Sequence, residues 1–262
     1  VVQQLASARP DNLGAYDLVL QGLEHHRRSG VTGQDAQTAF VFFGKAIEMD
    51  PGYARAYAWR ACSMANVAEW YPDRFEDDWI VDCTASVAKA LEIDPNDPEA
   101  HRIMGSIKLH KGDFDLAEYH HQKALELCPS DAYIRARYAT LLIYLGQAEE
   151  ALEQIHIAMR VDPFCPDLLF EDEGISYYCL EKFDQAVSSL KKLKVPTKNS
   201  LFYLAAAFFS LGQLDKAGET LSQATMTTGF DISRFIESQV YREESQKKHL
   251  EETLRSISTS VS

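Results

Sequence analysis

DPEAHRIMGSIKLHKGDFDLAEYHHQKALELCP, residues 97–129, decides the fold, because its pattern returns along the chain with a fixed period. Pro95, Pro129 and Pro163 stand 34 residues apart, and they close the similar phrases VAKALEIDP, HQKALELCP and HIAMRVDP. A fourth phrase, FFGKAIEMDP, ends at Pro51. Such a period is typical of a stacked array in which each unit buries its apolar face only against its neighbours.

Each unit is predicted to be two helices joined by a tight turn. Asp97 is placed to cap the first helix, and Pro98 occupies a position where a missing N–H costs nothing. Gly112 suits the left-handed turn that ends this helix, and Asp113 is placed to cap the second helix. Small residues recur where the paired helices must approach closely, at Gly105, Ala117, Ala124, Ala139, Ala151 and Ala158.

These residues resemble the tetratricopeptide repeat (TPR) family, a helix–turn–helix of 34 residues with small residues at the close-packing positions and a closing proline. The resemblance is strongest over residues 97–163. Further on, GISYYCLEKFDQAVSSLKKL keeps the expected offsets, but Glu181 replaces the turn glycine, which returns as Gly212. The resemblance implies an all-α fold, a right-handed TPR superhelix of about six helix pairs followed by C-terminal capping helices.

We expect one TPR array over residues 1–262, with the repeats in 13–228 and the capping helices in 229–262. The capping helices are predicted around Ile232–Val240 and Gln246–Ile257, with Ser245 as the cap of the second one.

Two segments depart from the period. SGVTGQ at 29–34 lengthens the first unit, and an insertion at 69–83, EWYPDRFEDDWIVDC, lengthens the second. The insertion contributes the aromatic residues Trp70, Tyr71, Phe75 and Trp79. Three interpretations stand in this order: the aromatics pack over the seam of a longer helix pair, they form a second protein interface, or Asp73, Asp77 and Asp78 bind calcium. The third is disfavoured, because the glycine and spacing of a calcium loop are absent.

Composition and charge limit the classes of partner. The net charge is −13, and the longest basic run is KKLK at 191–194. Nucleic acid and anionic membranes are therefore not expected as partners, because both attract clustered positive charge. The longest apolar stretch, LFYLAAAFFSL at 201–211, is too short to span a bilayer, and we expect a helix buried between neighbouring repeats.

The cysteines favour a cytoplasmic protein. Cys62, Cys83, Cys128, Cys165 and Cys179 are dispersed and show no Cys-x-x-Cys spacing. Such a set indicates reduced thiols rather than a disulfide framework. We expect no leading signal segment, and the start at VVQQ, without methionine, suggests a piece of a longer protein.

Neither a metal site nor a catalytic site is expected. His101, His110, His120 and His121 share one unit, but no metal-binding spacing is present. His101 and His121 are expected between the paired helices and His120 on the outside. The chain has no nucleophile elbow and no phosphate-binding glycine loop, so we expect a non-enzyme without cofactors.

The TPR resemblance implies a concave groove lined by the first helix of each repeat. Projected onto this sequence, the predicted partner-binding residues are Tyr53, Arg60, Met64, Arg102, Ser106, His110, Tyr133, Thr140, Tyr144, Tyr178, Phe202 and Phe209. Tyrosine and arginine concentrate binding energy at interfaces. The alternative is that these aromatic residues pack against the next repeat. The carboxylate clamp of chaperone-binding TPR proteins is absent, because the matching positions read Ala56/Arg60, Arg102/Ser106 and Ala136/Thr140.

A narrower resemblance concerns the two ends of the chain. PDNLGAYDLVLQGLEHHRR at 10–28 and HLEETLRSI at 249–257 look like the ends of the TPR tail of bacterial signalling proteins with a class III nucleotide cyclase or winged-helix domain. The matching residues are Pro10, Asn12, Ala15, Tyr16, Asp17 and Tyr241. No catalytic residue of a cyclase lies in this segment.

The leading hypothesis is a regulatory interaction module that binds a protein or peptide in the groove, or pairs with a second copy as a homodimer. The rival hypothesis is a structural spacer or homo-oligomerisation scaffold, whose groove is empty or filled by its own C-terminal helices.

Overall fold

The computed structural model describes residues 12–28, 32–71, 74–75, 79–162 and 167–260. Within these ranges the regular structure is helical and no β-strand occurs, which confirms the predicted all-α class. Pro10, Pro163 and Cys165 lie outside the described residues, as do the acidic residues Asp73, Asp77 and Asp78 of the insertion. None of the described helices is long and apolar enough to cross a membrane.

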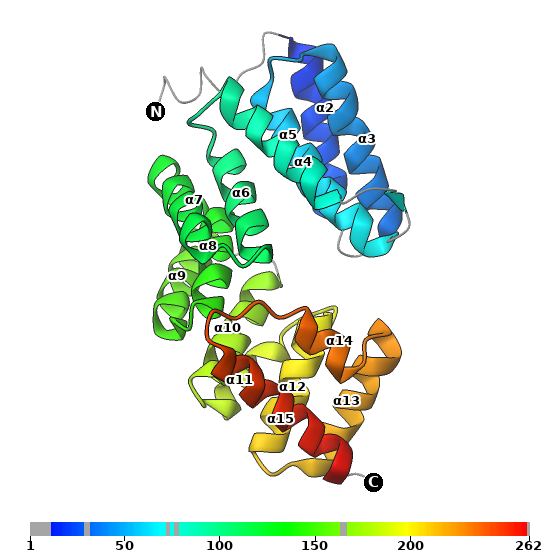
Figure 1. Ribbon diagram of the computed structural model, residues 1–262, viewed down its shortest axis with the longest axis vertical. Coiled ribbons are helices and arrows are strands. Elements are labelled where there is room, and N and C mark those ends of the chain that lie inside the picture. Colours follow the sequence, from blue (N-terminus) through cyan, green and yellow to red (C-terminus); the bar gives the residue numbers. More distant parts are fainter. Residues whose placement is uncertain (1–11, 29–31, 72–73, 76–78, 163–166, 261–262) are drawn as a thin grey trace. The chain divides into compact units, whose positions relative to one another are not determined.

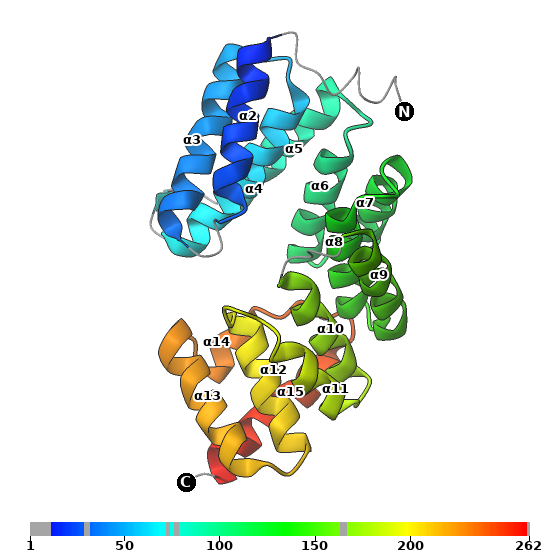
Figure 2. The same cartoon turned by 180° about the vertical axis from the view of Figure 1, so that it is seen from behind.

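The chain divides into two compact units, and the first, Val1–Pro129, is built from helix pairs (Figures 1 and 2). The three pairs described in it are α2 (Leu13–His26) with α3 (Gly33–Met49), α4 (Ala54–Trp70) with α5 (Trp79–Ile93), and α6 (Pro98–His110) with α7 (Phe114–Leu127). In both views α2 and α3 lie side by side.

The second unit, Ser130–Ser262, continues the same pattern and ends in two further helices. Its pairs are α8 (Ala132–Tyr144) with α9 (Ala148–Val161), α10 (Leu168–Cys179) with α11 (Phe183–Leu190), and α12 (Lys198–Ser210) with α13 (Leu214–Thr228). The last helices are α14 (Ile232–Glu237) and α15 (Glu244–Ser260). The described pairs therefore number six and are followed by two capping helices, as predicted. The single array over residues 1–262 stays a prediction.

The helix starts follow the local sequence, with two corrections. Asp97 Oδ1 accepts a hydrogen bond from the Ala100 N–H at 2.8 Å, and Pro98 stands in the first turn of α6. Asp113 precedes α7, but its side chain makes no capping hydrogen bond; it lies 3.7 Å from Lys108 Nζ. The prediction that Ser245 caps the last helix was wrong, because α15 begins at Glu244 and Ser245 lies inside it.

The turns between paired helices need a left-handed residue. Gly112, Gly146 and Gly212 have φ values of 72°, 80° and 72°, a region that glycine enters without a steric penalty. Glu181 takes the same role with a φ of 57°. Because a Cβ atom disfavours this conformation, the α10–α11 turn is strained where the sequence departs from the repeat pattern.

The predicted small residues do lie at the close approaches. Ala117, Ala124, Ala139, Ala151 and Ala158 have no exposed surface. A Cβ atom on Gly105 would stand 2.6 Å from Cδ2 of His121, so only glycine lets α6 approach α7 here. The apolar stretch 201–211 forms most of the buried helix α12, against which α15 packs in unit 2 (Figure 1).

Candidate interaction surface

The predicted groove residues of unit 1 separate into interior and accessible ones. Tyr53 and Met64 are buried, and Met64 belongs to a core cluster with Cys83 and Ile103. A partner cannot reach these side chains without displacing the core.

Arg102 is also an interior residue. Its side chain is only 2% exposed, and its Nε donates to Glu99 Oε2 at 2.7 Å. Its guanidinium lies over the Trp59 ring, 5.3 Å from the centroid, and so links α6 to α4. An alanine at this position would therefore cost stability as well as any contact with a partner.

Three predicted residues of unit 1 remain accessible. His110 is exposed and its ring lies 6.1 Å from that of Trp79. Arg60 is partly exposed, with its guanidinium 4.7 Å from the Phe40 ring centroid. Ser106 is partly exposed and donates to the Arg102 carbonyl at 3.3 Å. These side chains stay the predicted partner contacts of unit 1.

The insertion contains both packing and exposed aromatics. Phe75 and Trp79 pack against the core cluster of unit 1, and the Phe75 ring lies 6.1 Å from Phe40. Trp70 and Tyr71 are 44% and 39% exposed. The described part of the insertion therefore supports packing for the first two residues and leaves the second pair as the candidate interface.

In unit 2 the C-terminal segment, residues 231–257, packs on several of the predicted groove residues. Phe202 is fully buried because the ring of Phe235 stacks on it, with centroids 4.0 Å apart and planes 8° from parallel. Phe235 also meets Tyr203 edge-on at 6.1 Å.

The non-helical residues between α14 and α15 continue this contact. The Arg242 N–H donates to the Tyr144 carbonyl at 2.8 Å, and the Tyr144 hydroxyl donates to Gln239 Oε1 at 3.3 Å. The ring of Tyr241 lies 5.1 Å from that of Tyr144, and its hydroxyl hydrogen-bonds that of Tyr203. One backbone hydrogen bond and several side-chain hydrogen bonds together hold this stretch against α8 and α12.

The other predicted residues of unit 2 differ in their accessibility. Tyr178 is buried, with its ring 5.4 Å from that of Tyr203. Tyr133 is partly exposed beneath the guanidinium of Arg137. Thr140 is also partly exposed and donates to Asp172 Oδ2 at 2.7 Å. Phe209, near the end of α12, is partly exposed.

Three consecutive buried carboxylates, Glu171, Asp172 and Glu173, lie on α10. Burial raises the pKa of Glu171 to about 7, although a hydrogen bond from Thr197 opposes the shift. Burial likewise raises the pKa of Asp172 to about 6, against the opposing charge of Arg137.

Glu173 differs from its two neighbours because its side chain is fully engaged. It accepts from Ser189 at 2.7 Å and pairs with His156 and Lys192.

Three histidines of unit 1, His101, His120 and His121, lie on the paired helices α6 and α7. His101 and His121 are buried as predicted, but His120 is partly buried rather than outward-facing. His101 Nε2 donates to the Pro95 carbonyl at 3.0 Å, so its Nδ1 accepts from His120 Nδ1, also at 3.0 Å. Burial and the neighbouring His101 lower the pKa of His120 to about 4, which keeps the His120 imidazole neutral near pH 7. Across the described ranges, no group of three His, Cys, Asp or Glu side chains is arranged to hold a metal ion.

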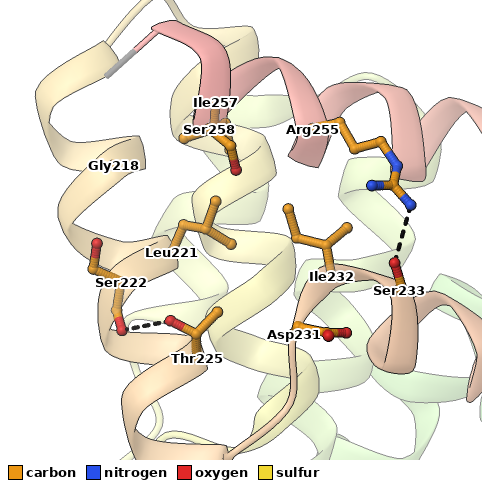
Figure 3. A pocket seen from close by; sticks show the side chains of 10 residues that line it. All are labelled: Gly218, Leu221, Ser222, Thr225, Asp231, Ile232, Ser233, Arg255, Ile257 and Ser258. Carbon is orange, nitrogen blue, oxygen red and sulfur yellow. Dashed lines mark hydrogen bonds between the residues drawn. The ribbon is translucent and has the colours of Figure 1, made fainter. Parts of the chain in front are cut away.

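A pocket of about 530 Å³ opens between α13, α14 and α15 (Figure 3). Leu221, Ile232 and Ile257 form its apolar part. Arg255 points away toward Ser233, to which it donates at 3.1 Å, and also pairs with Glu251. The polar groups do not converge on a common point, so the pocket does not resemble a catalytic site.

Comparison with known proteins gives the fold. No family model matches the chain. The type IV pilus biogenesis factor PilW superposes with a TM-score of 0.58 and 17% identity, covering 84% of this chain and 96% of PilW. TTC0263, a TPR protein of Thermus thermophilus, gives 0.56 and 20% identity, over 71% of this chain and 96% of that protein. The chain has the TPR fold.

The chain matches only a small part of the length of its curated relatives. The transcriptional regulator HilA of Salmonella typhimurium is 25% identical over 139 residues, which is 53% of this chain and 25% of HilA. Tetratricopeptide repeat protein 37 of Xenopus laevis is 26% identical over 236 residues, 87% of this chain and 14% of that protein. The chain thus spans about a quarter or less of these relatives.

The sequence left open that the C-terminal helices fill the groove, but it did not identify the residues that cover the surface in unit 2. Gln239 and Tyr241 reach Tyr144 across 95 and 97 positions, and no local pattern encodes that distance. The acidic residues 171–173 did indicate a buried carboxylate, because three adjacent side chains in the first helix of a repeat cannot all face solvent.

Proposed function

We propose that this chain is a non-catalytic protein-interaction module that binds a protein or peptide segment along the first helices of unit 1. Arg60, Ser106 and His110 are accessible there, and they combine donor groups with neighbouring aromatic rings. Arginine stacked on an aromatic ring is a frequent centre of binding energy.

The observation that carries this proposal is the C-terminal segment in unit 2. There the first helices α8, α10 and α12 hold a non-helical stretch of the same chain through the Arg242 N–H, Gln239 and Tyr241. This face of the repeats therefore has the chemistry to hold a non-helical polypeptide. A partner segment with aromatic and amide side chains is the corresponding ligand for unit 1.

We further propose that the module belongs to a larger bacterial regulatory protein. The match to HilA, whose name is that of a transcriptional regulator, supports a regulatory context. The motifs at 10–28 and 249–257 support an attached cyclase-like or winged-helix domain. Partner binding would alter that domain only through contacts that differ between its states.

A second candidate function, self-association, is favoured by one observation. Trp70 and Tyr71 are exposed beside each other at the end of α4, where two copies of the chain would bury them together. Light scattering across a concentration series, on the parent and on Trp70→Ala/Tyr71→Ala, tests this candidate. A dimer that the double variant loses supports it, and a monomer at every concentration contradicts it.

Site-specific crosslinking tests the interaction proposal. A photo-reactive amino acid replaces His110 in one variant and Tyr119, which is 55% exposed on α7, in a matched control. The proposal predicts crosslinks to one defined partner from position 110 and none from 119. Equal crosslinking from both positions would contradict it.

A further inference from the structure

Cys62 of α4 stands in a polar cluster that joins three helices of unit 1. His26, in the last turn of α2, places Nε2 at 3.6 Å from Cys62 Sγ. The other ring nitrogen, Nδ1, lies 3.4 Å from Ser63 Oγ and 3.5 Å from Asn66 Nδ2. The ring is fixed in place by Trp59, whose centroid is 5.0 Å away.

These contacts determine which ring nitrogen of His26 carries the proton. Asn66 Nδ2 can only donate, so His26 Nδ1 accepts. The ring proton of the neutral imidazole is then on Nε2, directed at Cys62 Sγ. A hydrogen bond to the charged form of a group stabilises that form, so this tautomer favours the thiolate.

The positively charged guanidinium of Arg102 reinforces the effect. Burial would raise the pKa of the Cys62 thiol, but His26 and Arg102 outweigh it and hold the pKa at about 7. Cys83, the neighbouring thiol on α5, has its pKa raised to about 12, chiefly by burial. Burial also raises the pKa of Cys179 in unit 2, to about 11.

We propose that Cys62 is a modification site, a nucleophilic thiol that reacts with hydrogen peroxide. As a residue Cys62 is partly exposed, unlike the buried Cys83, but its thiol lies deep among its neighbours, so the proposed oxidant is one as small as hydrogen peroxide. His26 and Arg102 approach it from α2 and α6. Thiolates next to positively charged or hydrogen-bond-donating groups are the reactive cysteines of proteins.

The reaction is a two-electron oxidation of the sulfur. The Cys62 thiolate attacks one peroxide oxygen, an S–O bond forms, and the O–O bond breaks. The second oxygen leaves as hydroxide and takes a proton to become water, while the sulfur becomes a sulfenic acid. The peroxide is reduced, and no further co-reactant is needed.

This site is independent of the proposed partner binding, but it lies in the same unit. The added oxygen would stand between α2 and α4, where His26, Ser63 and Asn66 now meet. Oxidation would therefore disturb the contact between the first two helix pairs.

The test is the pH profile of thiol alkylation in the native chain, read for each cysteine peptide by mass spectrometry. Cys62 should react with a midpoint near pH 7, while Cys83 and Cys179 stay unreactive below about pH 9. His26→Phe keeps a ring against Trp59 but removes the donor, and it should shift the midpoint to about 8.5, the ordinary cysteine value. At about pH 6 the alkylation rate at Cys62 should then fall about sixfold, after the lower nucleophilicity of a low-pKa thiolate is included.

A second variant keeps the test decisive if His26→Phe fails to fold. Asn66→Leu retains the imidazole and removes the donor to Nδ1, so it should raise the midpoint in the same direction. Peroxide treatment followed by a sulfenic-acid trap should label Cys62 first. A Cys62 midpoint at or above about 8.5 in the parent, or trapping no faster than at Cys128, would overturn the proposal.

Discussion

Replacing Phe235 by alanine should release the C-terminal segment from unit 2 while the repeats stay folded. Phe235 has no exposed surface, stacks on Phe202 at 4.0 Å and meets Tyr203 edge-on at 6.1 Å. Removing a buried phenylalanine side chain costs about 3–5 kcal/mol. The six-residue helix α14 has little stability of its own, so this loss falls on the docking of residues 231–257.

Hydrogen exchange measured by mass spectrometry reports the docking directly. A loss of about 3 kcal/mol corresponds to roughly a hundredfold increase in the opening of the docked segment. In Phe235→Ala the amides of α14 and α15 should therefore exchange at least about a hundredfold faster. The amides of α9 should change little, because α9 packs on α8 and α10.

Tyr241→Phe is the matched control for this experiment. It keeps the ring that packs 5.1 Å from Tyr144 and removes only the hydroxyl that bonds Tyr203. The expected cost is about 1 kcal/mol, or roughly a fivefold increase in exchange of the same segment. Uniform acceleration across all of unit 2 in Phe235→Ala, or no acceleration, would refute the view of a separately docked segment.

Two further predictions concern α10 and its turn. Because the folded-state pKa of Glu171 is about 7, its contribution to stability is complete below the unfolded value, near 4.5, and is lost as pH rises through 7. The loss of stability is roughly 3 kcal/mol. Glu171→Gln should remove this part of the pH dependence, and urea unfolding between about pH 5 and 8 measures it. Parallel curves of unfolding free energy against pH for parent and variant would contradict this prediction. Glu181→Gly should stabilise the chain by about 1 kcal/mol, because glycine adopts the observed φ of 57° without strain. A thermal midpoint below that of the parent would contradict this.

The helical repeat was predictable because its determinants are local. Asp97 caps α6 through the Ala100 N–H three residues away, and Gly112 ends the same helix with a positive φ. Both interactions involve neighbours in sequence, which the repeated pattern encodes directly. Ser245 failed as a cap because helix starts vary by a residue or two when several polar residues stand together.

The surface was less predictable because a helix position gives only the direction of a side chain. Arg102 was expected as an accessible positive group, yet its direction also brings it onto Trp59 and Glu99. Phe202 points as expected, but Phe235, 33 positions later, stacks on it. Which distant segment covers a face depends on tertiary packing, and no periodicity reports it.

The central claim is that the open first-helix face of unit 1 binds a partner segment. The most direct measurement is the affinity of a captured and purified partner for three forms of the chain: the parent, Arg60→Ala/His110→Ala, and an outer-face control, Leu116→Ala/Tyr119→Ala. Both residues of the control are exposed on α7, and thermal melts confirm that all three forms are folded. The account predicts that the dissociation constant rises at least tenfold for the first double variant, a loss of about 1.4 kcal/mol, and stays unchanged for the control. Equal affinity of all three forms, or a loss confined to the outer-face control, would contradict it.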